Sequence, residues 1–187
     1  MMRWAGLVLG IVLAAFVVVK FGLGVSTYSI MTDAMAPGLN TGDVVAAAAY
    51  RFSDPQRGDV VVFRPARTIV FVRRIAAMPG DRVQMRHGRL FLNGAEVPRT
   101  GGAGGQFGES LMGRQYRVLE PAGQRPLDDT AATLVPAGSF FVLSDNRDGA
   151  DDSRGALGLV PRSAIAGKAL VKLFDARAGR GSLAAVQ

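Results

Sequence analysis

Short apolar runs with turn residues between them fill the chain after Val25, and they constrain its fold more than any other feature. The runs are GDVVAAAAY, GDVVVFRP, TIVFVRRIAAM, RLFLNG, QYRVL and GSFFVLSD. They are rich in β-branched and aromatic residues, and Gly58, Pro65 and Pro136 lie among the residues that separate them. No long stretch has helical spacing, so the pattern predicts a mostly β fold with an antiparallel sheet.

Local signals divide this β region further. The segment RLFLNGAEV predicts a hairpin that turns at Asn93-Gly94. The glycine-rich segment 100–110 predicts a flexible connection, and the tail 175–187 predicts a loose end. Weaker patterning over 84–137 predicts a smaller cap lobe inserted into the main sheet. We therefore expect an anchor over 1–25 and a β domain over 26–187 that contains this lobe.

The N-terminus carries a continuous apolar run from Trp4 to Val19, followed by Lys20 and a further apolar stretch. A membrane span needs about 20 apolar residues, and the run reaches that length if Lys20 extends its amine toward the interface. Arg3 precedes the run, which predicts a cytoplasmic N-terminus and a main domain on the outer side. A cleaved secretory signal is the rival interpretation. We favour an anchor, one N-terminal transmembrane helix, because the run is long and no clean small-x-small site follows it.

Composition excludes several classes of site. The chain of 187 residues has no cysteine, so neither a disulfide framework nor a thiolate metal site is available. Its single histidine, His87, cannot build a histidine-rich metal cluster. The net charge of +7 comes mostly from scattered arginines without interleaved aromatic residues, which argues against nucleic-acid binding.

Four segments, in the order found in the family, resemble the membrane-anchored type I signal peptidases of bacteria. The first, with the family form Ser-Gly-Ser-Met-x-Pro-Thr-Leu before Gly-Asp, reads TDAMAPGL over 32–39 before Gly42-Asp43. The others are RGDVVVFRP over 57–65, VRRIAAMPGDRV over 72–83 and SDNRDGADDSRGALGLVP over 144–161. The resemblance implies an all-β core outside the membrane with an inserted cap lobe. It also implies removal of signal peptides from exported proteins.

Family members use a serine nucleophile and a lysine general base. By resemblance, the nucleophile position is Ala34 and the base position is Arg73, while the serine that positions the base is replaced by Ala150. Alanine has no hydroxyl, and arginine stays protonated and cannot accept a proton. The oxyanion hydroxyl position, Thr32, keeps its hydroxyl. The nucleophile, the base and the base-positioning serine are therefore lost together.

Residues that shape the site in the family remain in place. By resemblance these scaffold and groove residues are Met35, Pro37, Asp145, Arg147, Asp152 and Arg154. We predict a pseudoenzyme that binds signal peptides, exported or surface proteins, or an active peptidase. The alternatives are an active peptidase, engineered or using other residues, and a purely structural membrane protein with no peptide groove.

Other residues offer weaker routes to chemistry. Thr32 or Ser29 could replace the nucleophile, but each still needs a base, and His87 lies beside a predicted turn. The aspartates of DNRDGADD, 145–152, fit an ion-paired loop better than a pair of catalytic carboxylates. The segment lacks the glutamate and spacing of a calcium loop, so we expect no metal and no cofactor.

The arginine at the base position must find an anion if it is buried, because an unpaired buried charge is costly. We expect Arg73 to pair with Asp152, or failing that with Asp33. If residues 32–34 are extended, Asp33 points away from the face shared by Thr32 and Ala34.

Overall fold

The computed structural model describes residues 8, 14, 22, 24–65, 69–121, 123, 125–148 and 151–187. The predicted anchor over 1–25 lies mostly outside these residues, and so does Ala150. Within the described residues no helix has the length and apolar character needed to cross a membrane.

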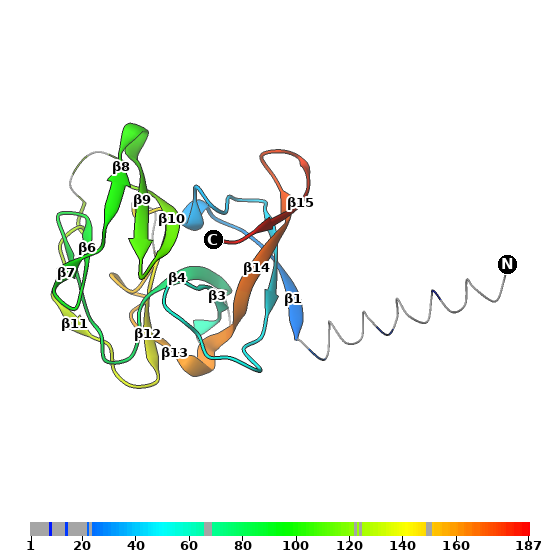
Figure 1. Ribbon diagram of the computed structural model, residues 1–187, viewed down its shortest axis with the longest axis horizontal. Helices are drawn as coiled ribbons and strands as arrows, with labels where there is room; N and C mark the ends of the chain where they lie inside the picture. The colour runs from blue at the N-terminus through cyan, green and yellow to red at the C-terminus, as the bar shows by residue number, and fades with distance from the viewer. Residues whose placement is uncertain are drawn as a thin grey trace.

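An eight-stranded antiparallel sheet forms the larger part of the described chain, in the order β1-β2-β14-β3-β4-β12-β13, with β15 paired to β14 (Figure 1). Its strands are β1 (Val25–Ser29), β2 (Val44–Ala48), β3 (Val60–Phe63), β4 (Phe71–Ala77), β12 (Ser139–Leu143), β13 (Val160–Pro161), β14 (Ile165–Asp175) and β15 (Arg180–Ala185). The predicted mostly β, antiparallel fold is confirmed.

The chain between β4 and β12 forms two smaller sheets, which lie together on one side of the molecule in Figure 1. One holds β5 (Arg82–Arg86), β6 (Arg89–Leu92), β7 (Ala95–Glu96) and β11 (Thr133–Leu134), and the other holds β8 (Arg99–Gly101), β9 (Gln106–Leu111) and β10 (Arg114–Leu119). The hairpin at Asn93-Gly94 is confirmed, with positive φ angles of 53° and 85° at the two turn residues. The division into an anchor, a β domain and an inserted lobe over 84–137 stays a prediction.

Two glycine-containing segments are more regular than predicted. Residues 100–110 are not a flexible connection, because β8 and β9 pair there on either side of the short 3-10 turn η4 (Ala103–Gly105). The tail is not loose, because β15 pairs with β14 along Arg180–Ala185. Both predictions followed from glycine, alanine and serine content, and backbone hydrogen bonds to a neighbouring strand outweigh those weak propensities.

The longest strand, β14, lies between β2 and β3 and joins the first strand pair to the rest of the sheet. It carries Gly167, where an added Cβ would lie 2.5 Å from the carbonyl oxygen of Ala48 on β2. Its lysines are neutralised by buried aspartates, with Lys168 2.7 Å from Asp59 and Lys172 2.7 Å from Asp43. These contacts let a strand with two charged residues lie inside a sheet.

The site is positioned by β4 and by the short 3-10 turn η2 (Asp33–Met35), which packs against it. A third 3-10 turn, η5 (Arg162–Ala164), leads into β14. Met35 anchors η2 to the main sheet, because its residue is only 2% exposed and packs in a cluster with Val60, Val62 and Val72 of β3 and β4. The neighbouring Ala34 is therefore held against the sheet.

Candidate functional site

Ala34, at the nucleophile position, is a buried methyl group at the centre of η2. Its residue is 4% exposed, and its carbonyl oxygen accepts a hydrogen bond from the Asn146 amide at 3.0 Å. The Asn146 side chain also donates to the Asp33 carbonyl at 3.2 Å. The loop after β12 thus holds η2 through backbone atoms that would be present whatever side chain stood at position 34.

Asp33 does not pair with Arg73. Its carboxylate accepts hydrogen bonds from the backbone amide and the hydroxyl of Thr41, both at 2.9 Å. These two bonds hold the pKa of Asp33 below its usual value. The backbone at Asp33 is not extended, because the residue begins a 3-10 turn, and its carboxylate bonds to the chain just ahead of β2.

Arg73, at the base position, is buried at 6% exposure and is bonded to backbone oxygens. Its Nε donates to the Asp151 carbonyl at 2.9 Å, and its Nη1 donates to the Val72 carbonyl at 2.7 Å. The predicted pairing with Asp152 is wrong, because that carboxylate already accepts bonds from Arg154 and from the Ser144 amide. Burial lowers the pKa of Arg73, and the nearby charges of Asp152, Asp151 and Asp145 oppose that shift.

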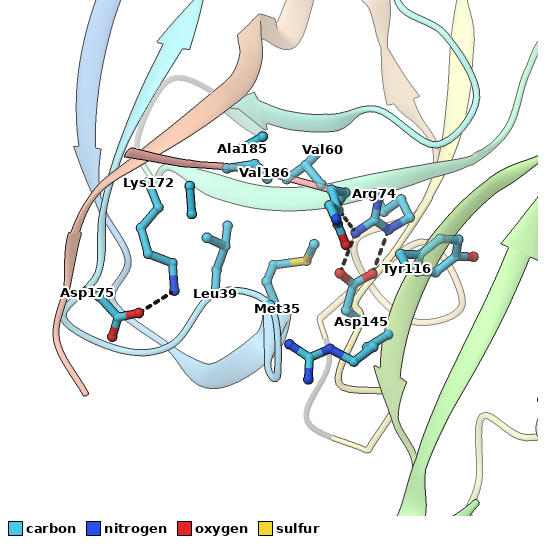
Figure 2. A pocket seen from close by; sticks show the side chains of 14 residues that line it. Met35, Leu39, Val60, Arg74, Tyr116, Asp145, Lys172, Asp175, Ala185 and Val186 are labelled. Atoms are coloured by element: carbon cyan, nitrogen blue, oxygen red, sulfur yellow. Dashed lines mark hydrogen bonds and ion pairs between the residues drawn. The ribbon is translucent and has the colours of Figure 1, made fainter. Parts of the chain in front are cut away.

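Arg74, the next residue on β4, lies on the opposite face of the strand, as the pleat requires. It makes a bidentate ion pair with Asp145, with Nε and Nη2 at 2.8 and 2.7 Å from the two carboxylate oxygens (Figure 2). Its guanidinium also lies 4.0 Å from the centre of the Tyr116 ring. This arginine therefore has the carboxylate partner that Arg73 lacks.

A second buried ion pair, between Arg147 and Glu109, is linked to the first through Tyr116. Arg147 lies 2.5 Å from Glu109, and Tyr116 donates its hydroxyl to the same Glu109 oxygen at 2.8 Å. Burial would raise the pKa of Glu109, but the charge of Arg147 and these hydrogen bonds hold it below its usual value. We call Arg74, Asp145, Tyr116, Glu109 and Arg147 the buried network.

The loop after β12 is tied together by charge, as predicted. Asp152 pairs with Arg154 at 2.9 Å, and Asp148 pairs with Arg125 at 3.2 Å. Within the described residues, no group of three histidine or acidic side chains is placed to hold a metal. His87 lies exposed in the turn between β5 and β6 with a positive φ of 48°, which confirms the interpretation of its position.

A groove of about 660 Å³ opens between β1 and the start of β4. Its lining is Thr27, Tyr28, Ser29, Ile30, Met31, Thr32, Met35, Ile69, Val70, Phe71, Val72, Arg73 and Asp151. Within the described part of the chain β1 pairs only with β2, so its other edge carries no strand. The groove therefore combines an apolar floor with an unpaired strand edge.

A smaller cavity of about 300 Å³ lies on the other side of Met35. Figure 2 shows Met35 in this cavity together with Arg74, Asp145, Lys172 and Val186. Met35 lines both spaces, so one side chain separates the groove from the buried network.

The sequence-predicted site residues thus fall into two sets. Thr32, Met35 and Arg73 line the groove, with Ala34 buried beside it and the half-buried Pro37 two residues after the end of η2. Asp145, Arg147, Asp152 and Arg154 lie in ion pairs behind it. Sequence reasoning missed the groove wall formed by 27–31 and 69–72, although the apolar flanks of both segments were the available signal. The catalytic roles assigned by resemblance stay predictions.

Comparison with known proteins places the chain in a family. The model of the signal peptidase family, peptidase S26, matches residues 1–174. A signal peptidase I from Rickettsia typhi is 33% identical over 84% of this chain and 64% of its own length. The signal peptidase I of Leptolyngbya laminosa is 31% identical over 83% of this chain and 74% of its own length. That of Pseudomonas aeruginosa is 30% identical over 78% and 63%.

The match with the Rickettsia and Pseudomonas relatives therefore spans slightly less than two thirds of their length. A crystal structure of a signal peptidase I from Enterococcus faecalis is 26% identical, with a TM-score of 0.42 over 62% of this chain and 97% of that one. A likeness of that degree adds nothing to the assignment. The family model covers nearly the whole chain, and on that ground this chain belongs to the signal peptidase family, peptidase S26.

Proposed function

We propose that this chain is a signal peptidase homologue that binds extended peptides in the groove without cutting them. The observation that carries the proposal is the chemistry at two positions. A buried methyl stands at Ala34, and the guanidinium of Arg73 donates to two backbone carbonyls. Neither group can act as nucleophile or base, because the first has no oxygen and the second stays protonated.

The unpaired edge of β1 supports peptide binding. An extended peptide can add to a free strand edge through main-chain hydrogen bonds, and apolar pockets then select its side chains. The groove offers both elements, since Tyr28, Ile30 and Phe71 line it beside that edge. Main-chain bonding of this kind needs no nucleophile, so binding can survive the loss of cleavage.

A cleavage assay tests the proposal. The purified full chain in detergent is mixed with an exported precursor that carries a small-x-small site, and products are followed by mass spectrometry. We expect no cleavage, together with saturable binding of a labelled peptide from the precursor. Cleavage at the expected bond that is lost in Thr32→Ala would instead support the alternative, an active peptidase with another nucleophile.

Restoration sharpens the test. The triple variant Ala34→Ser, Arg73→Lys and Ala150→Ser supplies a hydroxyl, a titratable amine and its positioning hydroxyl, so we expect it to cleave. The matched double variant Ala34→Ser and Ala150→Ser keeps the arginine and should stay inactive, because no base is present. A folded triple variant that binds peptide but does not cleave would argue against a preserved site.

For the location of the chain, we propose a single N-terminal span in the bacterial cytoplasmic membrane with the β domain on the outer, periplasmic or extracellular, side. The apolar run from Trp4 to Val19 and the preceding Arg3 support this orientation. Protease added to spheroplasts should degrade the β domain, whereas protease confined to the cytoplasmic side should leave it intact. The binding partners proposed are signal peptides, exported or surface proteins, or an active peptidase.

A further inference from the structure

Arg73 differs from the other buried arginines near the site in its partners. Arg74, Arg147 and Arg154 each pair with a carboxylate, on Asp145, Glu109 and Asp152. Within the described residues Arg73 has no carboxylate at ion-pair distance and donates only to backbone oxygens. A guanidinium at 6% exposure with neutral acceptors alone gains strongly from an anion that reaches it.

That anion has access from one direction. Arg73 lines the groove together with Thr32, whose side chain makes no capping bond to η2. A planar oxyanion at this point would meet the guanidinium and have a hydroxyl donor nearby. The remaining lining is largely apolar and borders the free edge of β1, which suits a peptide main chain rather than a phosphate or a free metabolite.

We propose that the groove receives the C-terminal end of a peptide, with the free terminal carboxylate paired to Arg73; the inference rests on the proposed peptide-binding function. A substrate of an active peptidase must run through the site as an uncut chain. A peptide that ends at Arg73 resembles instead the released product, or the C-terminal tail of an exported protein. The loss of the base thus converts a site for an internal peptide bond into a site for a chain end.

The carboxylate of Asp151 should weaken the binding of a peptide carboxylate at Arg73. The backbone carbonyl of Asp151 accepts from Arg73, and this exposed residue also lines the groove, so its carboxylate competes for the guanidinium. The charges of Asp152, which acts most strongly on Arg73, and of Asp145 also reach the guanidinium, but each of these carboxylates is already paired with another arginine. Removing the charge of Asp151 should therefore strengthen the binding of a terminal carboxylate.

The test compares matched peptides on the full chain in detergent. The probes are a fluorescent octapeptide that ends in Ala-Gln-Ala with a free acid, its C-terminal amide, and a longer peptide that continues past the final alanine. We expect the acid to bind at least about tenfold more tightly than the amide, the scale of one charge-assisted hydrogen bond. The preference should weaken as salt is raised.

Variants distinguish pairing of the peptide carboxylate with Arg73 from a general effect of net charge. Arg73→Gln should remove the preference for the acid, and Asp151→Asn should increase it. Arg82→Gln changes net charge equally at an exposed position of β5 and should leave the preference unchanged. Arg73→Lys keeps a basic group and should keep part of the preference at pH values where that amine is protonated, so it tests the pairing even if Arg73→Gln does not fold.

The outcomes distinguish the inference from the proposed function. Equal affinity for acid and amide would overturn the inference and leave peptide binding intact. Preference for the acid that persists in a folded Arg73→Gln variant would also overturn it, because the carboxylate would be held elsewhere. No binding of any of the three peptides would overturn the proposed function itself.

Discussion

The two faces of β4 carry neighbouring arginines, Arg73 and Arg74, that have different partners. Arg74 lies in the buried network, with a bidentate carboxylate and an aromatic ring against it. Arg73 lies on the groove, where its guanidinium donates to backbone oxygens and lies 5.3 Å from the centre of the Phe71 ring; within the described residues it has no carboxylate at ion-pair distance. On the network face each arginine has a carboxylate partner, whereas on the groove face Arg73, at the position that the resemblance predicts for the general base, has none within the described residues. The difference shows that two adjacent arginines on one strand acquire different partners because they lie on opposite faces of the sheet.

Removing the paired arginine should have the largest effect. Arg74→Met leaves Asp145 buried without a cation, so we expect the free energy of unfolding to fall by about 3–5 kcal/mol. Urea denaturation followed by circular dichroism measures the loss. A change below about 1 kcal/mol would mean that the buried network contributes no more than an exposed ion pair.

Truncating Met35, which lies between the groove and the buried network, should lower the free energy of unfolding nearly as much as Arg74→Met. Met35→Ala deletes a side chain that is 2% exposed and lines both cavities, and such truncations cost about 2–5 kcal/mol. It should also weaken peptide binding, because the two spaces would merge. Met112→Ala, at a residue 74% exposed, is the matched control and should leave stability and binding unchanged. Full stability in Met35→Ala would refute the separating role.

Lowering the pH should reduce the stability contributed by the buried network through Glu109, and Arg73 on the groove should have no part in that loss. The folded-state pKa of Glu109 is depressed, so its contribution to stability is present above the ordinary value of 4.5 and is lost as the pH falls through the folded pKa. Thermal unfolding between pH 7 and pH 3 should therefore show a decline below about pH 4.5. The decline should be shallower in Glu109→Gln and unchanged in Arg73→Met. Identical slopes in all three proteins would assign the decline to other carboxylates.

Replacing the groove arginine should have the smallest effect on stability. Arg73→Met removes a buried charge that has no carboxylate partner, so we expect a change within about 1 kcal/mol in either direction. The same urea titration measures it beside Arg74→Met. A loss comparable to that of Arg74→Met would show that its two backbone hydrogen bonds anchor the loop after β12.

The sequence predicts β3 and β12, whose apolar runs are uninterrupted, together with β4 and the hairpin at Asn93-Gly94. It does not reveal β14, because Gly167, Lys168 and Lys172 break the apolar pattern. Those lysines are acceptable in a sheet only because Asp59 and Asp43 meet them from distant segments. Local pattern carries no information on such partners.

The site shows the same division. Thr32, Met35 and Arg73, which the resemblance assigns to the site, line one groove. The resemblance does not predict the partners of Arg73, because Asp152 is taken by Arg154, a residue only two positions away. The competition between two arginines for one carboxylate depends on the loop geometry after β12. Only the folded chain decides which arginine is left with backbone oxygens.

The position of β14 has a consequence for the order in which the molecule can be assembled. In the described sheet the strand pair β1-β2 is joined to β3 and β4 by backbone hydrogen bonds only through β14, which is made after nearly all other strands. As the chain is synthesised from its N-terminus, the first hairpin must wait for residues 165–175 before the main sheet can close. Folding of this domain is therefore a late event, governed by a contact between segments far apart in the chain, and a strand edge stays open to chaperones or wrong partners until then.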